Sequence, residues 1–460
     1  MSAFVAIASI LAAYVAINFS PHKAFLNVYL PFLLLVPSYY QWNMPVLPDP
    51  NFQQAAIIPI FAIWLSRGTP GWKRSYADVL VFGFGLSMGV SEFINAGYKE
   101  AQNLMFDVVG SMFLPYVLAK SLVEPAGLRI VFGKRIVILL VIVSFFLLHH
   151  FITGSRYTIY HKIFGIIFPG QGWAWPTSYR WGLPRASGPY AHAILAGIIM
   201  IIGYRLQRWL EWSKAWPRRL NGFEWIPIST SRLFTLILFM GATLTLVRGP
   251  ISGGIVAAVI VLVGRSKRRW LIFTLILIFF ILVTPPTVAW FIDYASVGRM
   301  AAASESQETF AYRWELIVNY FDVAMEKFVW GWGRNTWPKH PEQPSIDNYY
   351  LLLFLMHGFM GVGFLFAILL VMPARLFIYS MFQPVAHPSG SSLGFTLLSV
   401  YIVVGWSIAT VYLGEQTIPL LFLLVGWSEG YLLYDRQQTQ TKGDDPPPDN
   451  RIFKFKRVLS

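Results

Sequence analysis

Four arginines interrupt the chain where positive charge is hard to accommodate. They are Arg180 and Arg185, ahead of an apolar run near 189–205, Arg248, between two apolar runs, and Arg313, in a later polar stretch. A guanidinium next to a membrane interior is unfavourable unless an anion pairs with it. Several guanidinium groups together suit the oxygens of a phosphate or pyrophosphate. For Arg248 taken alone, snorkelling to phospholipid headgroups is the alternative.

An aspartate stands where the longest polar stretch ends. Asp347 is followed by Asn348 and Tyr349 and then by an apolar run. A carboxylate at this point can accept a proton from a sugar hydroxyl while Asn348 fixes the geometry, as general-base catalysis requires. Asp347 can equally cap the helix that follows. If it is only a cap, Glu415 and His192 are the next candidates for the base.

The histidines show no metal-ligand spacing. The chain has no cysteine, so a disulfide, a thiolate nucleophile and a cysteine-ligated metal are excluded. His149, His150, His192 and His357 do not form a ligand motif, and no phosphate-binding loop, zinc-protease helix or nucleophile elbow occurs. We therefore expect neither a metal nor a cofactor.

The composition is that of a membrane protein. Of 460 residues, 56% are hydrophobic and only 13% charged, against about 25% charged in soluble proteins. The net charge of +14 comes from Lys and Arg in short clusters between apolar runs, as in cytoplasmic loops. Topology explains this charge better than a nucleic-acid partner does. The sequence predicts an all-α, polytopic integral membrane protein.

The apolar runs predict about 12 to 13 transmembrane helices, since each approaches the roughly 20 residues that cross a bilayer. They lie near 2–19, 24–40, 52–66, 77–95, 101–120, 136–151, 189–205, 231–247, 251–264, 270–285, 348–371, 394–412 and 417–434. The runs at 52–66 and 251–264 are short for a span.

Alternate connections hold the basic clusters, which assigns those connections to the cytoplasm. The same alternation puts the amino terminus and two long connections, 152–188 and 286–347, on the outer side. Long loops usually have a functional role. We expect residues 1–434 to form one membrane domain, and the Gly, Asp and Pro content of 435–460 predicts a disordered cytoplasmic tail.

The second long connection contains a predicted amphipathic helix. Ser304 and Gln307 have capping-box spacing at its start. Its apolar face recurs at steps of four and three residues: Phe310, Trp314, Ile317, Phe321, Ala324 and Phe328. We expect this helix to lie over the bundle, and a helix resting at the membrane interface is the alternative.

The order of these features resembles the O-antigen ligase and polymerase superfamily. The resemblance covers roughly residues 180–370. Its motifs are Arg185-Ala186-Ser187-Gly188-Pro189, Arg248-Gly249, Arg313-Trp314, Gly331-Trp332-Gly333, Asp347-Asn348-Tyr349-Tyr350-Leu351 and the stretch from Gly358 to Gly361.

The resemblance implies transfer of a glycan from undecaprenyl pyrophosphate to an acceptor hydroxyl on the periplasmic side of the bacterial inner membrane. Arg185 and Arg248 would hold the pyrophosphate, and Asp347 stands where the ligases have a proposed catalytic histidine. Further substrate contacts are expected from Arg180, Arg313, Asn348, Tyr349, His192 and Glu415. Trp173, Trp175 and Trp181 could line an acceptor cleft or belong to the interfacial aromatic belt.

The aspartate in place of histidine makes the chain more similar to exopolysaccharide and capsule polymerases than to ligases. We therefore predict a polymerase of lipid-linked repeat units. An O-antigen or protein-glycan ligase is the alternative, and a lipid-linked glycan flippase or transporter is a third. Expected partners are the undecaprenyl-pyrophosphate-linked glycan, membrane lipids, a flippase, and chain-length or export proteins.

Overall fold

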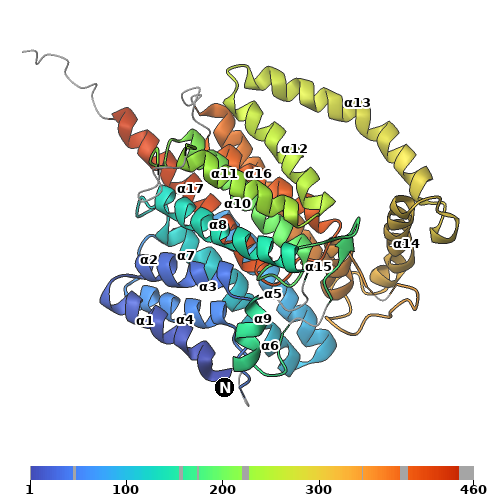
Figure 1. Ribbon diagram of the computed structural model, residues 1–460, viewed down its shortest axis with the longest axis horizontal. Coiled ribbons are helices and arrows are strands. Elements are labelled where there is room, and N and C mark those ends of the chain that lie inside the picture. The colour runs from blue at the N-terminus through green and yellow to red at the C-terminus, as the bar shows by residue number, and fades with distance from the viewer. Residues whose placement is uncertain are drawn as a thin grey trace, which may run out of the picture.

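The computed structural model describes residues 2–44, 48–154, 159–172, 176–219, 227–343, 345–383 and 392–444. Nearly all regular structure in these ranges is helical (Figure 1), and the strands described there form one two-stranded hairpin. The predicted all-α fold of a polytopic membrane protein is confirmed.

Helices occur at every predicted span. They are η1 (Ser2–Val5) with α1 (Ala6–Asn18); α2 (Pro21–Ala24), η2 (Phe25–Tyr29) and α3 (Leu30–Leu35) in succession; α4 (Phe52–Ser66); α5 (Tyr76–Ala96); α6 (Tyr98–Val108), η3 (Val109–Phe113) and α7 (Leu114–Leu122) in succession; α8 (Arg129–Thr153); α10 (Ala193–Trp212); α11 (Thr230–Leu244); α12 (Arg248–Arg265); α13 (Arg269–Ala295); α15 (Tyr349–Phe382); α16 (Leu393–Ile408); and α17 (Thr417–Asp444).

Eight of these helical segments, within the described ranges, are long and apolar enough to cross a bilayer. α1, α4, α11 and α16 are shorter apolar helices. The span expected near 24–40 is wrong at its far end, because the helix stops at Leu35. α7 packs on α17, α5 on α15, and α12 on α16, so distant segments of the chain share one core (Figure 1).

The outer connection expected at 286–347 begins later than predicted. α13 continues to Ala295 although Pro285 and Pro286 lie inside it. Each proline removes one N–H donor, yet the backbone keeps its helical path. Ala295 is the one buried residue of this helix, which arches away from the bundle and reaches α14 (Figure 1).

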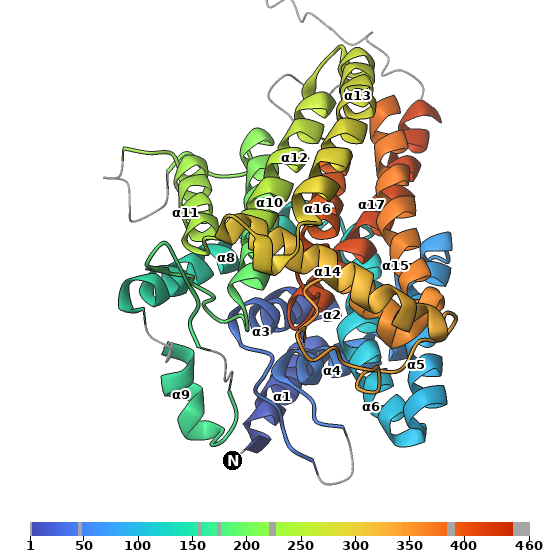
Figure 2. The same ribbon diagram turned by 90° about the vertical axis from the view of Figure 1, so that its right-hand side faces the viewer.

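The predicted amphipathic helix is confirmed as α14 (Glu305–Glu326), and the Ser304 hydroxyl accepts a hydrogen bond from the Gln307 amide. Figure 2 shows it lying across one side of the bundle. The predicted buried face is wrong in part. The residues that are buried are Ala311, Leu316, Tyr320 and Ala324, whereas Ile317 and Phe321 are exposed. The exposed pair is suited to contact with a membrane interface.

The segment after α14 crosses α15 at a break in that helix. Gly358 interrupts α15 with φ 64° and ψ −164°. Four main-chain hydrogen bonds join the two segments: Trp332 N–H to Leu355 O, Gly333 N–H to Met356 O, Phe359 N–H to Phe328 O and Met360 N–H to Val329 O. A Cβ on Gly358 would lie 2.4 Å from the Val329 carbonyl, and one on Gly331 would lie 2.6 Å from the Gly358 nitrogen. Both positions therefore require glycine.

The first long connection, 152–188, is more ordered than a plain loop. It contains α9 (Ile159–Ile167) and the antiparallel strands β1 (Tyr179–Arg180) and β2 (Leu183–Pro184). Strands this short have no hydrophobic period by which sequence could have found them. The predicted disordered tail is also wrong at its start, because α17 runs to Asp444. Residues 445–460 lie outside the described residues.

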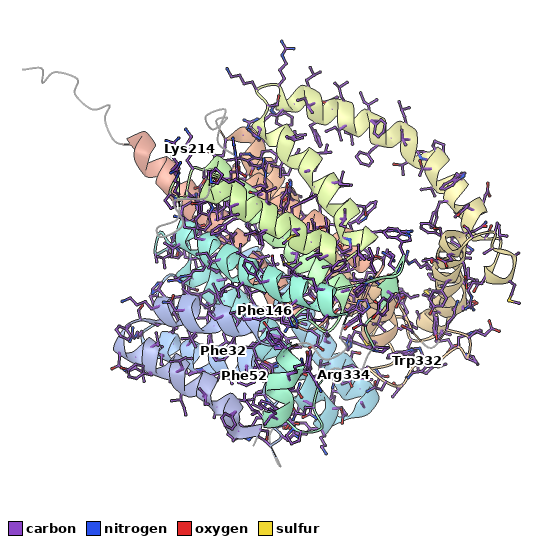
Figure 3. All side chains as sticks on the ribbon, in the orientation of Figure 1. Phe32, Phe52, Phe146, Lys214, Trp332 and Arg334 are labelled. Carbon is purple, nitrogen blue, oxygen red and sulfur yellow. The ribbon has the colours of Figure 1, made fainter. Side chains whose placement is uncertain are left out.

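Two connections that were predicted to lie on opposite sides of the membrane lie at opposite ends of the bundle. Figure 3 places Lys214, from a basic connection, at one end, and Trp332 and Arg334, from the second long connection, at the other. The orientation in the membrane remains a prediction.

Single-cysteine labelling tests that orientation cleanly, since the native chain has no cysteine. Cysteines at Gln171 and Ser345 should react with an impermeant maleimide in intact cells. Cysteines at Ser213 and Ser266 should react only after the cells are permeabilised. If position 213 is labelled in intact cells, the predicted orientation is wrong and a periplasmic reaction is excluded.

Candidate functional site

A tight hairpin holds two of the four arginines. β1 and β2 are joined by Trp181 and Gly182, with φ 52° and 74°. Positive φ at both positions is typical of the type I′ turn that matches strand twist. The Arg185 amide donates to the Ser178 carbonyl at 2.9 Å and extends the pairing. The hairpin thus fixes Arg180 and Arg185 close together.

The side chains of these two arginines make few hydrogen bonds within the described residues. Arg180 Nη1 donates to the Leu246 carbonyl at 2.5 Å. Arg185 Nη1 reaches the Ser178 hydroxyl at 3.4 Å. The Arg185 Nε is buried and has no hydrogen-bond partner within the described part of the chain. A buried, unsatisfied donor is unfavourable, so a ligand oxygen would stabilise it.

Arg248 is the first residue of α12, rather than a residue in a connection between helices. The residue before it, Val247, provides no side-chain cap. A cation at a helix N-terminus opposes the helix dipole, which attracts anions there. The Arg248 guanidinium carbon lies 5.3 Å from the centre of the Trp181 ring. Arg248 therefore faces the hairpin that holds Arg180 and Arg185.

All four arginines line one cavity of about 740 Å³, called the arginine cavity below. Arg313 reaches it from α14, and its buried Nε has no partner among the described residues. The rest of the wall comes mainly from α12, α15 and α16. It is largely apolar, with Phe366, Leu369, Leu370, Pro373, Ile402 and Trp406. The cavity therefore combines a cationic end with an apolar wall.

The positive charge of the arginine cavity is not neutralised by ion pairs. None of the four arginines has a carboxylate partner within 4.0 Å in the described ranges. Burial lowers the pKa of Arg185 to about 10, and the charge of Arg180 adds to this. Burial also lowers the pKa of Arg180, followed by repulsion from Arg248 and Arg313. A bound anion would relieve this repulsion.

Asp347 lies near this cluster but does not line the arginine cavity. Its side chain is exposed, and Ser345 donates a hydrogen bond to Oδ1 at 3.2 Å. Burial lowers the pKa of Arg313, and the charge of Asp347 acts in the opposite direction. The carboxylate is therefore within electrostatic range of the arginine on α14.

The alternative that Asp347 caps the helix is wrong. Asn348 is the N-cap of α15, and its Oδ1 accepts from the amides of Tyr350 at 3.0 Å and Leu351 at 3.2 Å. Asn348, expected to fix substrate geometry, thus has a structural role in this structure. Asp347 precedes the cap, so no backbone bond of the helix depends on it.

The tyrosine that reaches the arginine cavity is the neighbour of the predicted one. Tyr349 is buried in the main hydrophobic core, whereas Tyr350 lines the cavity and donates to the Gly405 carbonyl at 2.9 Å. Successive residues point about 100° apart around a helix. Sequence alone could not decide which of the two faces the site. It also missed Phe310 and Trp406, which read as ordinary apolar residues.

His192 and Glu415 do not line the arginine cavity. His192 caps α10 by accepting the Ile194 amide on Nδ1 at 3.2 Å. Burial lowers the pKa of His192 to about 4; Arg185 adds to this and Asp347 opposes it. Glu415 is half-buried and accepts a hydrogen bond from Ser38, and burial raises its pKa. Trp173 and Trp175 lie outside the described residues.

The fold and site define a polytopic membrane protein with a cavity suited to a ligand that has an anionic group and an apolar part. Residues 233–366 match the family model described as O-antigen ligase. This match confirms the resemblance to the O-antigen ligase and polymerase superfamily, and with it a glycosyltransferase-like or ligase enzyme. Arg248, Arg313 and Asp347 lie inside the matched region, and Arg180 and Arg185 lie ahead of it. No curated protein matches the chain.

Proposed function

We propose that the protein is a polysaccharide polymerase of the bacterial inner membrane. It moves a growing glycan from undecaprenyl pyrophosphate to a sugar hydroxyl of a second lipid-linked repeat unit, on the periplasmic face. The proposal rests mainly on the convergence of Arg180, Arg185, Arg248 and Arg313 on one cavity. Such a cluster suits a pyrophosphate far better than the single charge of a phospholipid phosphate.

The two ends of the arginine cavity match the two parts of this donor. The guanidinium groups and the N-terminus of α12 attract the pyrophosphate. The apolar wall from α15 and α16 suits isoprenoid carbons, and burying each CH₂ contributes about 0.8 kcal/mol. A ligand held in this way presents its first sugar near the hairpin and Asp347.

In the reaction we propose, the acceptor hydroxyl oxygen attacks C1 of the donor sugar. The bond between C1 and the pyrophosphate oxygen breaks, and its electron pair stays on the pyrophosphate. The hydroxyl proton passes to the Asp347 carboxylate. The arginines stabilise the charge that develops on the leaving group, a form of catalysis in which one lost donor reduces the rate by about 10²- to 10³-fold.

A ligase is the second candidate. The matched family model is described as O-antigen ligase, and a ligase would use the same donor and the same arginine cavity. The acceptor would then be a finished lipid or protein rather than another repeat unit. In either case a flippase and chain-length or export proteins would be the functional partners.

Glycan analysis of a deletion strain separates these functions. For a polymerase, we expect chains reduced to single repeats. Full-length chains left on the undecaprenyl carrier would instead assign the protein as a ligase. Repeats trapped on the cytoplasmic leaflet would assign it as a flippase and refute both transfer reactions. Complementation by the native gene and by an Arg248→Ala variant controls for effects on neighbouring genes.

A further inference from the structure

A second, smaller cavity lies beside the arginine cavity. It has a volume of about 300 Å³, and Arg185 lines both cavities. The other polar side chains of its wall include Tyr39, His150, His161, Thr177, Ser178 and His192. No aspartate or glutamate is among its described lining residues. The proposed binding of the donor makes no use of this second cavity.

Hydrogen bonds around His150 orient Thr177 toward a ligand. The Ser187 amide donates to His150 Nδ1 at 3.4 Å, so a neutral imidazole has its proton on Nε2. That Nε2 lies 3.3 Å from the Thr177 hydroxyl oxygen. The histidine therefore donates to Thr177, and the threonine proton remains available for a ligand oxygen.

His192 offers a second donor of fixed direction. Its Nδ1 accepts the Ile194 amide at 3.2 Å, so in the neutral ring the proton is on Nε2. This arrangement makes His192 a hydrogen-bond donor and unsuited to act as a base. The guanidinium group of Arg185, which lines both cavities, adds a third donor on the side shared with the arginine cavity.

A wall of fixed donors with one cation and no anion suits an uncharged ligand rich in oxygen acceptors. A pyrophosphate would find only one guanidinium in the second cavity but four in the arginine cavity. A sugar ring has hydroxyl and ring oxygens that accept such bonds. The volume is at the small end of ligand sites, which favours one sugar over a longer stretch of glycan.

We infer that the second cavity binds the terminal sugar of the acceptor glycan and places its attacking hydroxyl next to Arg185. This inference rests on the proposed function. The shared wall brings the acceptor hydroxyl toward C1 of a donor whose pyrophosphate lies in the arginine cavity. As in the proposed reaction, the acceptor oxygen bonds to C1, the bond between C1 and the pyrophosphate oxygen breaks, and the hydroxyl proton passes to Asp347. The charge of Asp347 acts on both His192 and Arg313.

Two conservative variants test the site. Thr177→Val removes the donor hydroxyl and keeps the shape, and His192→Asn keeps an N-cap acceptor but removes the Nε2–H donor. The matched control is Thr153→Val, because Thr153 lies at the outer end of α8 and bonds its own helix. The assay uses the purified full chain, the undecaprenyl-pyrophosphate-linked repeat unit as donor, and the repeat-unit oligosaccharide, released from the lipid by mild acid, as acceptor.

Thr177→Val and His192→Asn should raise the acceptor concentration for half-maximal transfer roughly tenfold, as expected for one lost hydrogen bond. The half-saturating donor concentration should change less than about twofold, and Thr153→Val should match the native protein. Equal acceptor dependence in Thr177→Val and Thr153→Val would overturn the inference. So would an equal loss of donor affinity, which would assign the cavity to the donor.

Calorimetric binding of the oligosaccharide distinguishes this inference from the proposed function. If the native protein shows no transfer but binds the oligosaccharide, and Thr177→Val weakens that binding, the proposed function fails and the sugar site stands. If transfer occurs and binding is unaffected by Thr177→Val, the proposed function stands and the sugar site fails.

Discussion

Arg248→Ala is expected to reduce chain growth by at least about 10²-fold, the effect of losing one donor to developing negative charge. Arg248 lines the arginine cavity and is also the first residue of α12, so its guanidinium lies beside the helix N-terminus that attracts anions. Arg248→Lys should restore little activity, because an ammonium group keeps the charge but lacks the planar fork that binds two oxygens at once. In vitro transfer with the lipid-linked repeat unit, followed by electrophoretic sizing, measures both variants.

Loss of activity in Arg248→Ala should not come from unfolding. A cation at the start of a helix opposes the helix dipole, so its removal should leave stability unchanged or raise it by about 0.3–1 kcal/mol. Thermal unfolding in detergent checks this. Arg268→Ala is the matched control, because Arg268 is exposed in the connection at the other end of α12. If Arg248→Ala makes chains of near-native length at equal expression, Arg248 does not bind the pyrophosphate, and its role is to contact phospholipid headgroups.

Asp347→Asn is expected to cut turnover by about 10²- to 10⁴-fold, the range typical of lost acid–base catalysis. A neutral amide cannot take up the proton of the acceptor hydroxyl. Because Asn348 caps α15, the substitution leaves the helix start intact. Removing a negative charge near Arg313 should leave donor binding unchanged or tighter, so the half-saturating donor concentration should not rise.

The control for Asp347 is Asp322→Asn, an equivalent change at an exposed residue of α14. Asp347→His tests the likeness to the ligases, whose proposed catalytic histidine stands at this place, and partial activity would support a shared role. Native turnover in Asp347→Asn would show that the base lies elsewhere. Glu415 would then be the next candidate, since the Nδ1 of His192 is already occupied by the Ile194 amide.

Sequence predicted the helices well and their ends less well. Long apolar runs mark helices because the bilayer requires internal backbone hydrogen bonds. The predicted span ended near residue 285, yet α13 continues through Pro285 and Pro286 to Ala295, because an exposed helix can lose two donors without leaving its path. In α15 the sequence reads as one apolar run through Gly358, where the backbone breaks. That break depends on a partner segment, which periodicity cannot reveal.

The arginines were recognisable from the sequence because charge next to apolar runs needs an explanation. Their meeting in one cavity depends on the hairpin and on the position of α14, both set by tertiary contacts. The choice of Tyr350 over Tyr349 depends on a rotation of α15 that a run of apolar residues leaves open. The second cavity was not predictable, because its wall joins residues from four separate parts of the chain: Tyr39, His150, Thr177 and His192.

The crossing of α15 by the segment after α14 has a consequence for how such a protein can diversify. The outer segment is fastened to the membrane helix by peptide groups at Phe328, Val329, Trp332 and Gly333. Peptide groups are the same whatever the side chain. Side chains along the loop can therefore be exchanged to suit a new sugar. The register of the loop against α15, and with it the position of Arg313, stays the same. Gly331, Gly333 and Gly358 are the exceptions, because all three have a positive φ that other residues rarely adopt.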